Sequence, residues 1–98
     1  MKIYIAGKIT GMKRLDVNIV FTRAHDYIEE LGNEVINPLE ITKHLPDGTE
    51  WVEYMAVCIP ALLECDAIYM LNNWEDSEGA KLEHALAKNT GMKIFYQP

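Results

Sequence analysis

The sequence predicts an α/β fold in which helices cover both faces of a parallel sheet. Short apolar runs alternate with helical patterns along the chain, no tight hairpin turn joins two runs, and the third run is apolar without alternation. Alternating strands and helices are joined by right-handed crossovers, which make the strands parallel. A strand that is apolar on both sides is typical of a sheet buried on both faces.

The composition is that of one globular domain, residues 1–98. The chain is 49% hydrophobic and 24% charged, and its net charge is −6. An acidic balance gives no reason to expect a nucleic-acid polymer or an anionic membrane as a partner. No apolar run approaches membrane-spanning length and there is no basic-then-apolar leader, so we expect a cytoplasmic protein.

The chain opens with a strand, a glycine-bounded loop and an amphipathic helix. Lys2–Ala6 (KIYIA) predicts a buried first strand, which Gly7 closes. The loop at residues 7–11 matches neither a Walker motif nor a dinucleotide fingerprint. Asp16 is expected to cap the helix, and Gly32 lies where a left-handed residue ends one. The apolar residues of this helix recur at a spacing of three or four: Val17, Val20, Phe21, Ala24, Tyr27, Ile28 and Leu31.

The middle of the chain predicts a brief second strand and a second helix. Residues 34–37 (EVIN) form the strand, which Pro38 stops. Residues 39–48 form a loop, or a loop with one helical turn. Thr49 is expected to cap the helix that follows, and Pro60 is expected to kink or break it.

The last third predicts a strand, a helix and a closing strand. Residues 67–71 (AIYML) form the continuous apolar strand. Ser77 is a plausible N-cap for the next helix, with Glu78 in a first turn that favours negative charge. That helix ends at residues 89–91, and Lys93–Tyr96 (KIFY) is the fourth strand.

These elements predict a single-domain, flavodoxin-like or Rossmann-like three-layer sandwich with about four parallel strands in the order 2-1-3-4. The switch point of such a sheet lies between the first and third strands, at their carboxyl ends. Loops 7–11 and 72–77 are therefore expected to meet at one crevice, where sheets of this kind bind ligands.

Glu83 lies at an unusual place on the helical wheel. A carboxylate on an apolar arc either reaches water from the edge of the buried face or points into a pocket, because an unpaired buried charge is costly. The wheel alone leaves both readings open. The arc consists of Gly79, Ala80, Leu82, Leu86 and Ala87.

The cysteines and histidines indicate neither a disulfide nor a metal site. Cys58 and Cys65 are seven residues apart, about 10 Å along a continuous helix, which is too far for a disulfide. There is no Cys-x-x-Cys motif, and the three histidines lack ligand spacing. We expect buried, reduced thiols.

Four segments together resemble the nucleoside 2-deoxyribosyltransferase superfamily over nearly the whole chain. KIYIAGKITG is similar to the family's first strand and loop, VINP to its second strand and GMKIFY to its closing strand. CDAIYMLNNWEDSEGAKLEHALA is similar to its Asp-strand-loop-Gly-x-x-x-Glu-x-x-x-Ala signature. Within the superfamily, the chain looks like its small, uncharacterised domains.

The resemblance implies that Glu83 is a nucleophile that attacks C1′ of a 2-deoxyribosyl group. Asp66 would contact the base or help to protonate it, and Tyr4 would orient the Glu83 carboxylate. Gly7 would let the sugar or phosphate approach the backbone. Structural roles are the alternatives: Asp66 could cap the preceding element, and Tyr4 could be a core aromatic.

Four further residues are substrate-binding candidates. Trp74 could stack on a base or cover the sheet edge, and Asp76 could be a ligand or an N-cap. Ser77 stands where the well-studied transferases carry an aspartate, and its hydroxyl at a helix N-terminus would suit a phosphate or sugar oxygen. Gly79 keeps the first helical turn small.

Two other departures from the family concern position 58 and the end of the sequence. Cys58 stands where similar small domains often carry an acidic residue. The sequence also ends at Pro98, without the fifth strand and tail with which family members complete a neighbouring active site.

The resemblance implies a reaction at the N-glycosidic bond of a (deoxy)nucleoside or its 5′-monophosphate, by transfer or hydrolysis, with a slight preference for the 5′-nucleotide. It implies no metal or redox cofactor, a small-molecule nucleoside or nucleotide as partner, and a homo-oligomer. The alternative is a non-catalytic module that sequesters or senses a nucleotide.

Overall fold

The computed structural model describes all 98 residues and confirms the predicted architecture. Its four strands form one parallel sheet in the order β2-β1-β3-β4. The strands are β1 (Lys2–Ala6), β2 (Glu34–Ile36), β3 (Ala67–Met70) and β4 (Lys93–Tyr96). The helices are α1 (Arg14–Glu30), α2 (Pro38–Ile41), α3 (Trp51–Leu63) and α4 (Glu78–Asn89), with the short 3-10 turn η1 at Trp74–Asp76.

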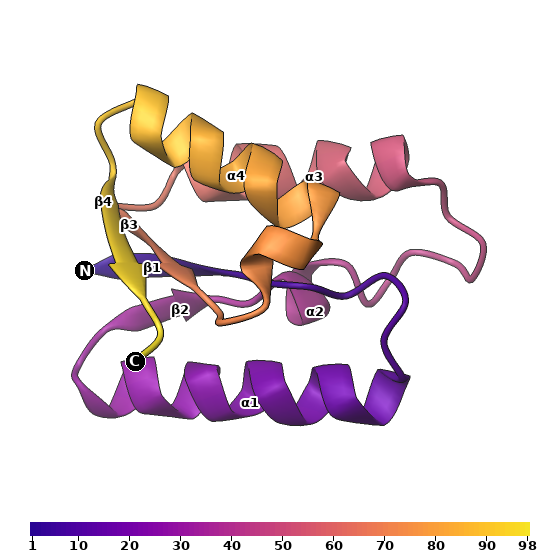
Figure 1. Ribbon diagram of the computed structural model, residues 1–98, viewed down its shortest axis with the longest axis horizontal. Coiled ribbons are helices and arrows are strands. Elements are labelled where there is room, and N and C mark those ends of the chain that lie inside the picture. The colour runs from indigo at the N-terminus through magenta and orange to yellow at the C-terminus, as the bar shows by residue number, and fades with distance from the viewer.

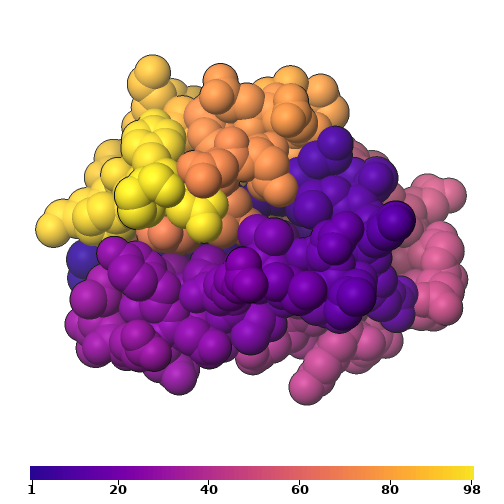
Figure 2. All heavy atoms as spheres, turned by 60° about the horizontal axis from the view of Figure 1, so that its bottom comes forward, coloured from indigo at the N-terminus to yellow at the C-terminus, as the bar shows by residue number.

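The helices form a layer on each face of the sheet. Figure 1 shows α1 along one face, and α3 and α4 side by side along the other. Figure 2 looks onto the α1 side and shows the C-terminal residues at the surface beside that helix. None of the helices is both long and apolar enough to span a membrane.

Alternate residues of β1 point into two different cores. Ile3 and Ile5 point toward α1 and share a core with Phe21 of that helix. Tyr4 and Ala6 point to the opposite face, into the core beneath α3 and α4. Tyr4 is fully buried and pairs in register with Ile36 of β2 and Ile68 of β3. The first strand therefore delivers one tyrosine to the α3–α4 side of the sheet.

The starts of α1 and α3 differ from the prediction. Helix α1 begins at Arg14, with Lys13 at the N-cap and no side-chain cap, so Asp16 lies within the first turn. Helix α3 begins at Trp51, with Glu50 and not the predicted Thr49 at the N-cap. The Thr49 hydroxyl donates instead to the carbonyl oxygen of Pro46 at 2.6 Å, within the preceding turn.

Of the two alternatives predicted at Pro60, the break is wrong, because α3 runs through this residue to Leu63; the kink stays a prediction. Cys58 and Leu62, on either side of Pro60, are both fully buried, so core packing holds the helix on course. Pro60 itself is exposed, where the loss of one backbone donor is tolerated.

The second and third strands each end one residue earlier than predicted. The Asn37 side chain accepts a hydrogen bond from the backbone N–H of Leu39 and caps α2, whose first residue is Pro38. The loop after β2 thus contains one helical turn, which confirms the second of the two alternatives predicted for residues 39–48. Both cysteines are buried free thiols.

Candidate active site

A cavity of about 810 Å³ opens at the carboxyl edge of the sheet. Residues from the β1 loop, α2, α3, η1 and α4 line it. The two loops predicted to meet do so here: the backbone N–H of Lys8 donates to the side-chain oxygen of Asn73 at 3.0 Å. Gly7 and Thr10 line the cavity from the first loop, and Asp76 and Ser77 line it from the second.

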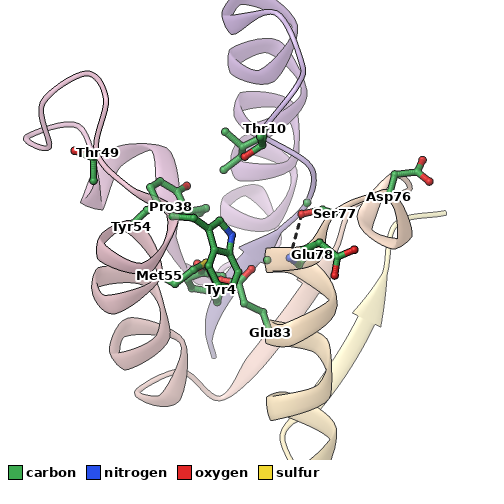
Figure 3. Close-up of a pocket in the computed structure, with 15 residues that line it drawn as sticks. Tyr4, Thr10, Pro38, Thr49, Tyr54, Met55, Asp76, Ser77, Glu78 and Glu83 are labelled. Carbon is green, nitrogen blue, oxygen red and sulfur yellow. Dashed lines mark hydrogen bonds between the residues drawn. The ribbon is translucent and has the colours of Figure 1, made fainter.

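Glu83 and Tyr4 form a buried pair at this cavity. Glu83 is only 6% exposed, and the Tyr4 hydroxyl donates a hydrogen bond to its Oε2 atom. Figure 3 shows the Glu83 carboxylate turned toward Tyr4. The apolar arc therefore carries a carboxylate aimed into a pocket, and Tyr4 is more than a core aromatic because its hydroxyl contacts that carboxylate.

Burial controls the protonation of this pair. It raises the pKa of Glu83 to about 7, and the Tyr4 hydrogen bond acts in the opposite direction by stabilising the ionised carboxylate. Burial and the neighbouring Glu83 charge hold the pKa of Tyr4 well above its usual range. Near neutral pH, Tyr4 is thus a hydroxyl donor and Glu83 lies close to the midpoint of its ionisation.

The N-terminus of α4 forms another wall. The Ser77 hydroxyl oxygen accepts a hydrogen bond from the Ala80 N–H at 3.1 Å, which confirms Ser77 as the N-cap. Gly79 and Ala80 line the cavity within the first turn. Ala80 is fully buried, whereas Gly79 is half-buried, and the absence of a side chain on Gly79 leaves room for Met55 and Trp51 of α3.

Gly7 combines a cavity position with a packing requirement. A Cβ atom on this residue would lie 2.5 Å from Leu71 Cδ1 and 2.9 Å from Leu71 Cβ. Leu71 is fully buried, so it has little room to move away. Packing against Leu71 at the end of the adjoining strand therefore requires glycine here.

Asp66 lies outside the cavity, contrary to the role that the resemblance implied. Its carboxylate accepts a hydrogen bond from the backbone N–H of Lys2 at 2.8 Å. Asp66 directly precedes β3, which places it at the amino edge of the sheet, whereas the cavity lies at the carboxyl edge. The length of a four-residue strand, about 13 Å, separates the two.

Trp74 is also outside the cavity. Its ring stacks on His84 with the ring centroids 4.2 Å apart, and His84 Nε2 is 2.8 Å from the Tyr96 hydroxyl. Trp74 thus joins η1 to α4 and β4, so it covers the sheet edge. Asp76 lines the cavity, but Figure 3 shows its carboxylate pointing away from Glu83.

Helix α3 contributes residues to the cavity that were not predicted from the sequence. Trp51, Tyr54 and Met55 line the cavity from its first two turns. Their three–four spacing was visible in the sequence, but it equally describes a core-facing stripe. The Tyr54 hydroxyl is buried and has no hydrogen-bond partner. The other lining residues not singled out from the sequence are Ile9, Thr10, Pro38, Thr49, Glu78 and Ala80.

The site contains no ready-made metal centre. No group of three or more His, Cys, Asp or Glu side chains is placed to hold a metal ion. Cys58 lies in the core that contains Tyr4, and burial raises the pKa of its thiol to about 11. A neutral thiol at this depth is a small apolar side chain, not a nucleophile.

Comparison with known proteins supports the resemblance at the level of the fold. A 2-deoxyribosyltransferase from the psychrotolerant bacterium Bacillus psychrosaccharolyticus is similar over 98% of this chain and 71% of its own, with 18% sequence identity and a TM-score of 0.74. At that identity the likeness shows a shared fold. No curated protein matches the chain. Residues 1–96 match a family described as Domain of unknown function (DUF4406), and the chain therefore belongs to the DUF4406 family, with a deoxyribosyltransferase-like fold.

Proposed function

We propose that the protein cleaves or transfers at the N-glycosidic bond of a nucleoside through a covalent glycosyl-Glu83 intermediate. The observation that carries this proposal is the buried Glu83 carboxylate, held by the Tyr4 hydroxyl at a cavity large enough for a nucleoside. Burial strips water from the carboxylate, and an ionised, poorly solvated carboxylate is a strong nucleophile toward an electron-poor sugar carbon. The solved neighbour, a 2-deoxyribosyltransferase described as a biocatalyst for nucleoside synthesis, supports the same chemistry.

The proposed reaction has two displacements at C1′ of the sugar. First, a Glu83 carboxylate oxygen bonds to C1′ while the C1′–N bond breaks, and the electron pair of that bond leaves with the base. The base takes up a proton from water at the rim, where the exposed Asp76 and Glu78 line the cavity. A second base or a water molecule then attacks C1′, loses its own proton to solvent, and frees the Glu83 carboxylate. Two inversions retain the configuration at C1′.

The charge of the lining favours a nucleoside over its 5′-monophosphate. Asp76, Glu78 and Glu83 line the cavity, and no lysine or arginine does. A phosphate would face these carboxylates without a cationic partner, at a cost in binding free energy. We therefore place the uncharged nucleoside ahead of the 5′-nucleotide that the sequence favoured slightly.

Product analysis tests the proposal. Wild type and Glu83→Ala are incubated with a panel of deoxynucleosides and their 5′-monophosphates, with and without a second base, and the released or exchanged base is measured by chromatography. We expect turnover by the wild type and a loss of about 10³-fold or more in Glu83→Ala. Glu53→Ala, at an exposed residue of α3 outside the cavity, is the matched control and should keep full activity.

One observation supports a second candidate, a non-catalytic nucleoside- or nucleotide-binding module. The carboxyl group expected to protonate the leaving base, Asp66, is at the far edge of the sheet. Stoichiometric binding of a nucleoside, without base release under any condition of the panel, would favour this candidate. The homo-oligomer implied by the resemblance remains a prediction, which light scattering would test.

A further inference from the structure

The cavity walls differ in chemistry. The side chains that α3 contributes are Trp51, Tyr54 and Met55, which are aromatic or apolar apart from one buried hydroxyl. The opposite wall contains the hydroxyls of Thr10 and Ser77, which come from the loops at residues 7–11 and 72–77. A nucleoside has the same asymmetry, with a flat apolar base on one side and a hydroxyl-bearing sugar on the other. The base therefore fits the α3 wall, and the sugar fits the loop wall.

The α3 wall lies at the right distance from Glu83. A Cβ atom on Gly79 would lie 3.3 Å from Met55 Sδ and 3.6 Å from Trp51 Nε1, so these two side chains stand directly against the first turn of α4. Glu83 follows Gly79 by four residues on the same helix, a rise of about 6 Å. A base bonded to a C1′ atom at Glu83 extends over about this distance and would reach the indole.

We propose that Trp51 is the base-stacking residue of the site, that Met55 supports it, and that Trp51 makes the site prefer two-ring purine bases over one-ring pyrimidines. This inference rests on the proposed function for the position of the sugar at Glu83. Trp51 is 48% exposed, whereas Met55 behind it is only 6% exposed. A large aromatic ring at a cavity mouth with half its surface in water gains contact when a flat base covers it.

The purine preference follows from contact area. Base–aromatic stacking corresponds to a change of roughly tenfold to a hundredfold in affinity per base, and it tolerates any base because every base has a flat face. A purine covers more of an indole than a pyrimidine does. We therefore expect 2′-deoxyadenosine to bind more tightly than 2′-deoxycytidine, and this ratio to fall toward one in Trp51→Ala.

Intrinsic fluorescence tests whether the base lies against Trp51, because the chain has only two tryptophans. Trp51 lines the cavity and Trp74 stacks on His84 outside it, so Trp74→Phe and Trp51→Phe are matched variants. We expect 2′-deoxyadenosine to quench the emission of the wild type and of Trp74→Phe but not that of Trp51→Phe, whose phenyl ring still binds the nucleoside. Quenching that survives in Trp51→Phe and disappears in Trp74→Phe overturns the proposal.

Calorimetric affinities and base-release rates separate this inference from the proposed function. With folding confirmed by thermal melting, Trp51→Ala should lose roughly tenfold to a hundredfold in 2′-deoxyadenosine affinity and less in 2′-deoxycytidine affinity. No loss for either ligand overturns the stacking role, and an equal loss for both overturns the purine preference, even if Glu83-dependent base release is found. Quenching of Trp51 without base release supports the stacking role and contradicts the glycosyl transfer. Failure to bind either nucleoside contradicts both.

Discussion

Glu83 owes its position to a helical stripe of small residues. Ala80, Glu83 and Ala87 are the buried residues of α4, and the two alanines leave room for a longer side chain between the helix and the sheet. A buried carboxylate without a donor would be costly, and Tyr4 supplies the donor from the neighbouring strand. The sequence could indicate the stripe, but only the register of β1 brings the hydroxyl to it.

The titration of Glu83 should control the pH dependence of activity. In the proposed reaction only the ionised carboxylate attacks C1′, so kcat/KM for base release should rise with pH through a midpoint near 7, the pKa to which burial raises this group. Tyr4→Phe removes the hydrogen bond that stabilises the ionised form. The midpoint should therefore move to higher pH in that variant. A pH–rate profile measures both, and an unshifted or lowered midpoint in Tyr4→Phe would contradict the role of the hydroxyl.

Gly7 allows a test of the packing at the end of β1. Gly7→Ala places a Cβ atom 2.5 Å from Leu71 Cδ1, and such overpacking costs about 1–3 kcal/mol of unfolding free energy. Adding Leu71→Ala removes the clashing side chain. The cost of the double variant in urea denaturation should then be smaller than the sum of the two single costs. Strict additivity would show that the contact with Leu71 is not the reason for glycine here.

Asp66 shows where a resemblance and the topology of the chain can disagree. The sequence itself places this residue before the third strand, at the amino edge of a parallel sheet, whereas ligands bind at the carboxyl edge. The motif alone suggested the cavity. The place of Glu83 on the buried stripe could be predicted from helical periodicity, which is local, whereas its contact with Tyr4 was implied only by the resemblance.

At the level of the elements, the start of α4 is the predicted feature that the site depends on most. The Ser77 oxygen satisfies the Ala80 N–H, and the turn it stabilises lines the cavity. Ser77→Ala should cost about 1 kcal/mol of unfolding free energy, and Ser77→Asp, which restores an N-cap acceptor, should recover most of it. Urea denaturation measures both; equal stability of Ser77→Ala and wild type would mean that the cap contributes nothing.

Pro60 is an unfavourable residue in α3, because the helix continues through it. Pro60 lies inside the helix and is exposed, so alanine would restore a backbone donor and remove the clash of the ring with the preceding turn. Part of this gain is lost because proline also restricts the unfolded chain. We expect Pro60→Ala to raise the unfolding free energy by about 1–2 kcal/mol in the same denaturation assay. A decrease would show that the helix bends at Pro60 to fit its core.

The incorrect cap at Thr49 has a local physical cause. A polar residue before an apolar stripe is a good cap only if its side chain is free to turn back onto the helix. Thr49 is engaged by the Pro46 carbonyl, and α1 begins at Arg14 without any side-chain cap. Ser77 has no competing partner and caps as predicted. Which acceptor a hydroxyl chooses is decided by the turn around it, and the sequence pattern does not show that geometry.

At the scale of the whole molecule, the site is assembled from parts that are distant in sequence. Strand order and the carboxyl-edge crevice could be predicted, because alternation of strands and helices leaves few arrangements. The approach of Trp51 and Met55 to Gly79 could not, because it depends on how α3 and α4 pack against each other. That contact adds an aromatic wall to a site that the sequence describes only by its loops and its carboxylate.

The buried Glu83 carboxylate should also make the unfolding free energy of the whole domain depend on pH. The dependence should run opposite to that of the usual acidic group, whose ionisation stabilises the fold. Burial raises the pKa of Glu83 from 4.5 to about 7, so between these values the folded state holds a proton that the unfolded state has lost. Folding is then progressively disfavoured as pH rises through this window, by about 3 kcal/mol in total. Glu83→Gln is neutral at every pH and should remove this loss, becoming more stable than the wild type at pH 8.

Urea denaturation at pH 5 and pH 8 measures that difference. Glu53→Gln, which removes one exposed carboxylate from α3, is the matched control and should keep the pH dependence of the wild type. The same pH dependence in Glu83→Gln as in the wild type would mean that Glu83 stays ionised in the folded protein at pH 5. Such a result would also lower the expected midpoint of the pH–rate profile, because the activity and the stability titrate through one group. The two measurements therefore test a single arrangement, in which burial of one carboxylate supports the proposed reaction and lowers the stability of the fold above neutral pH.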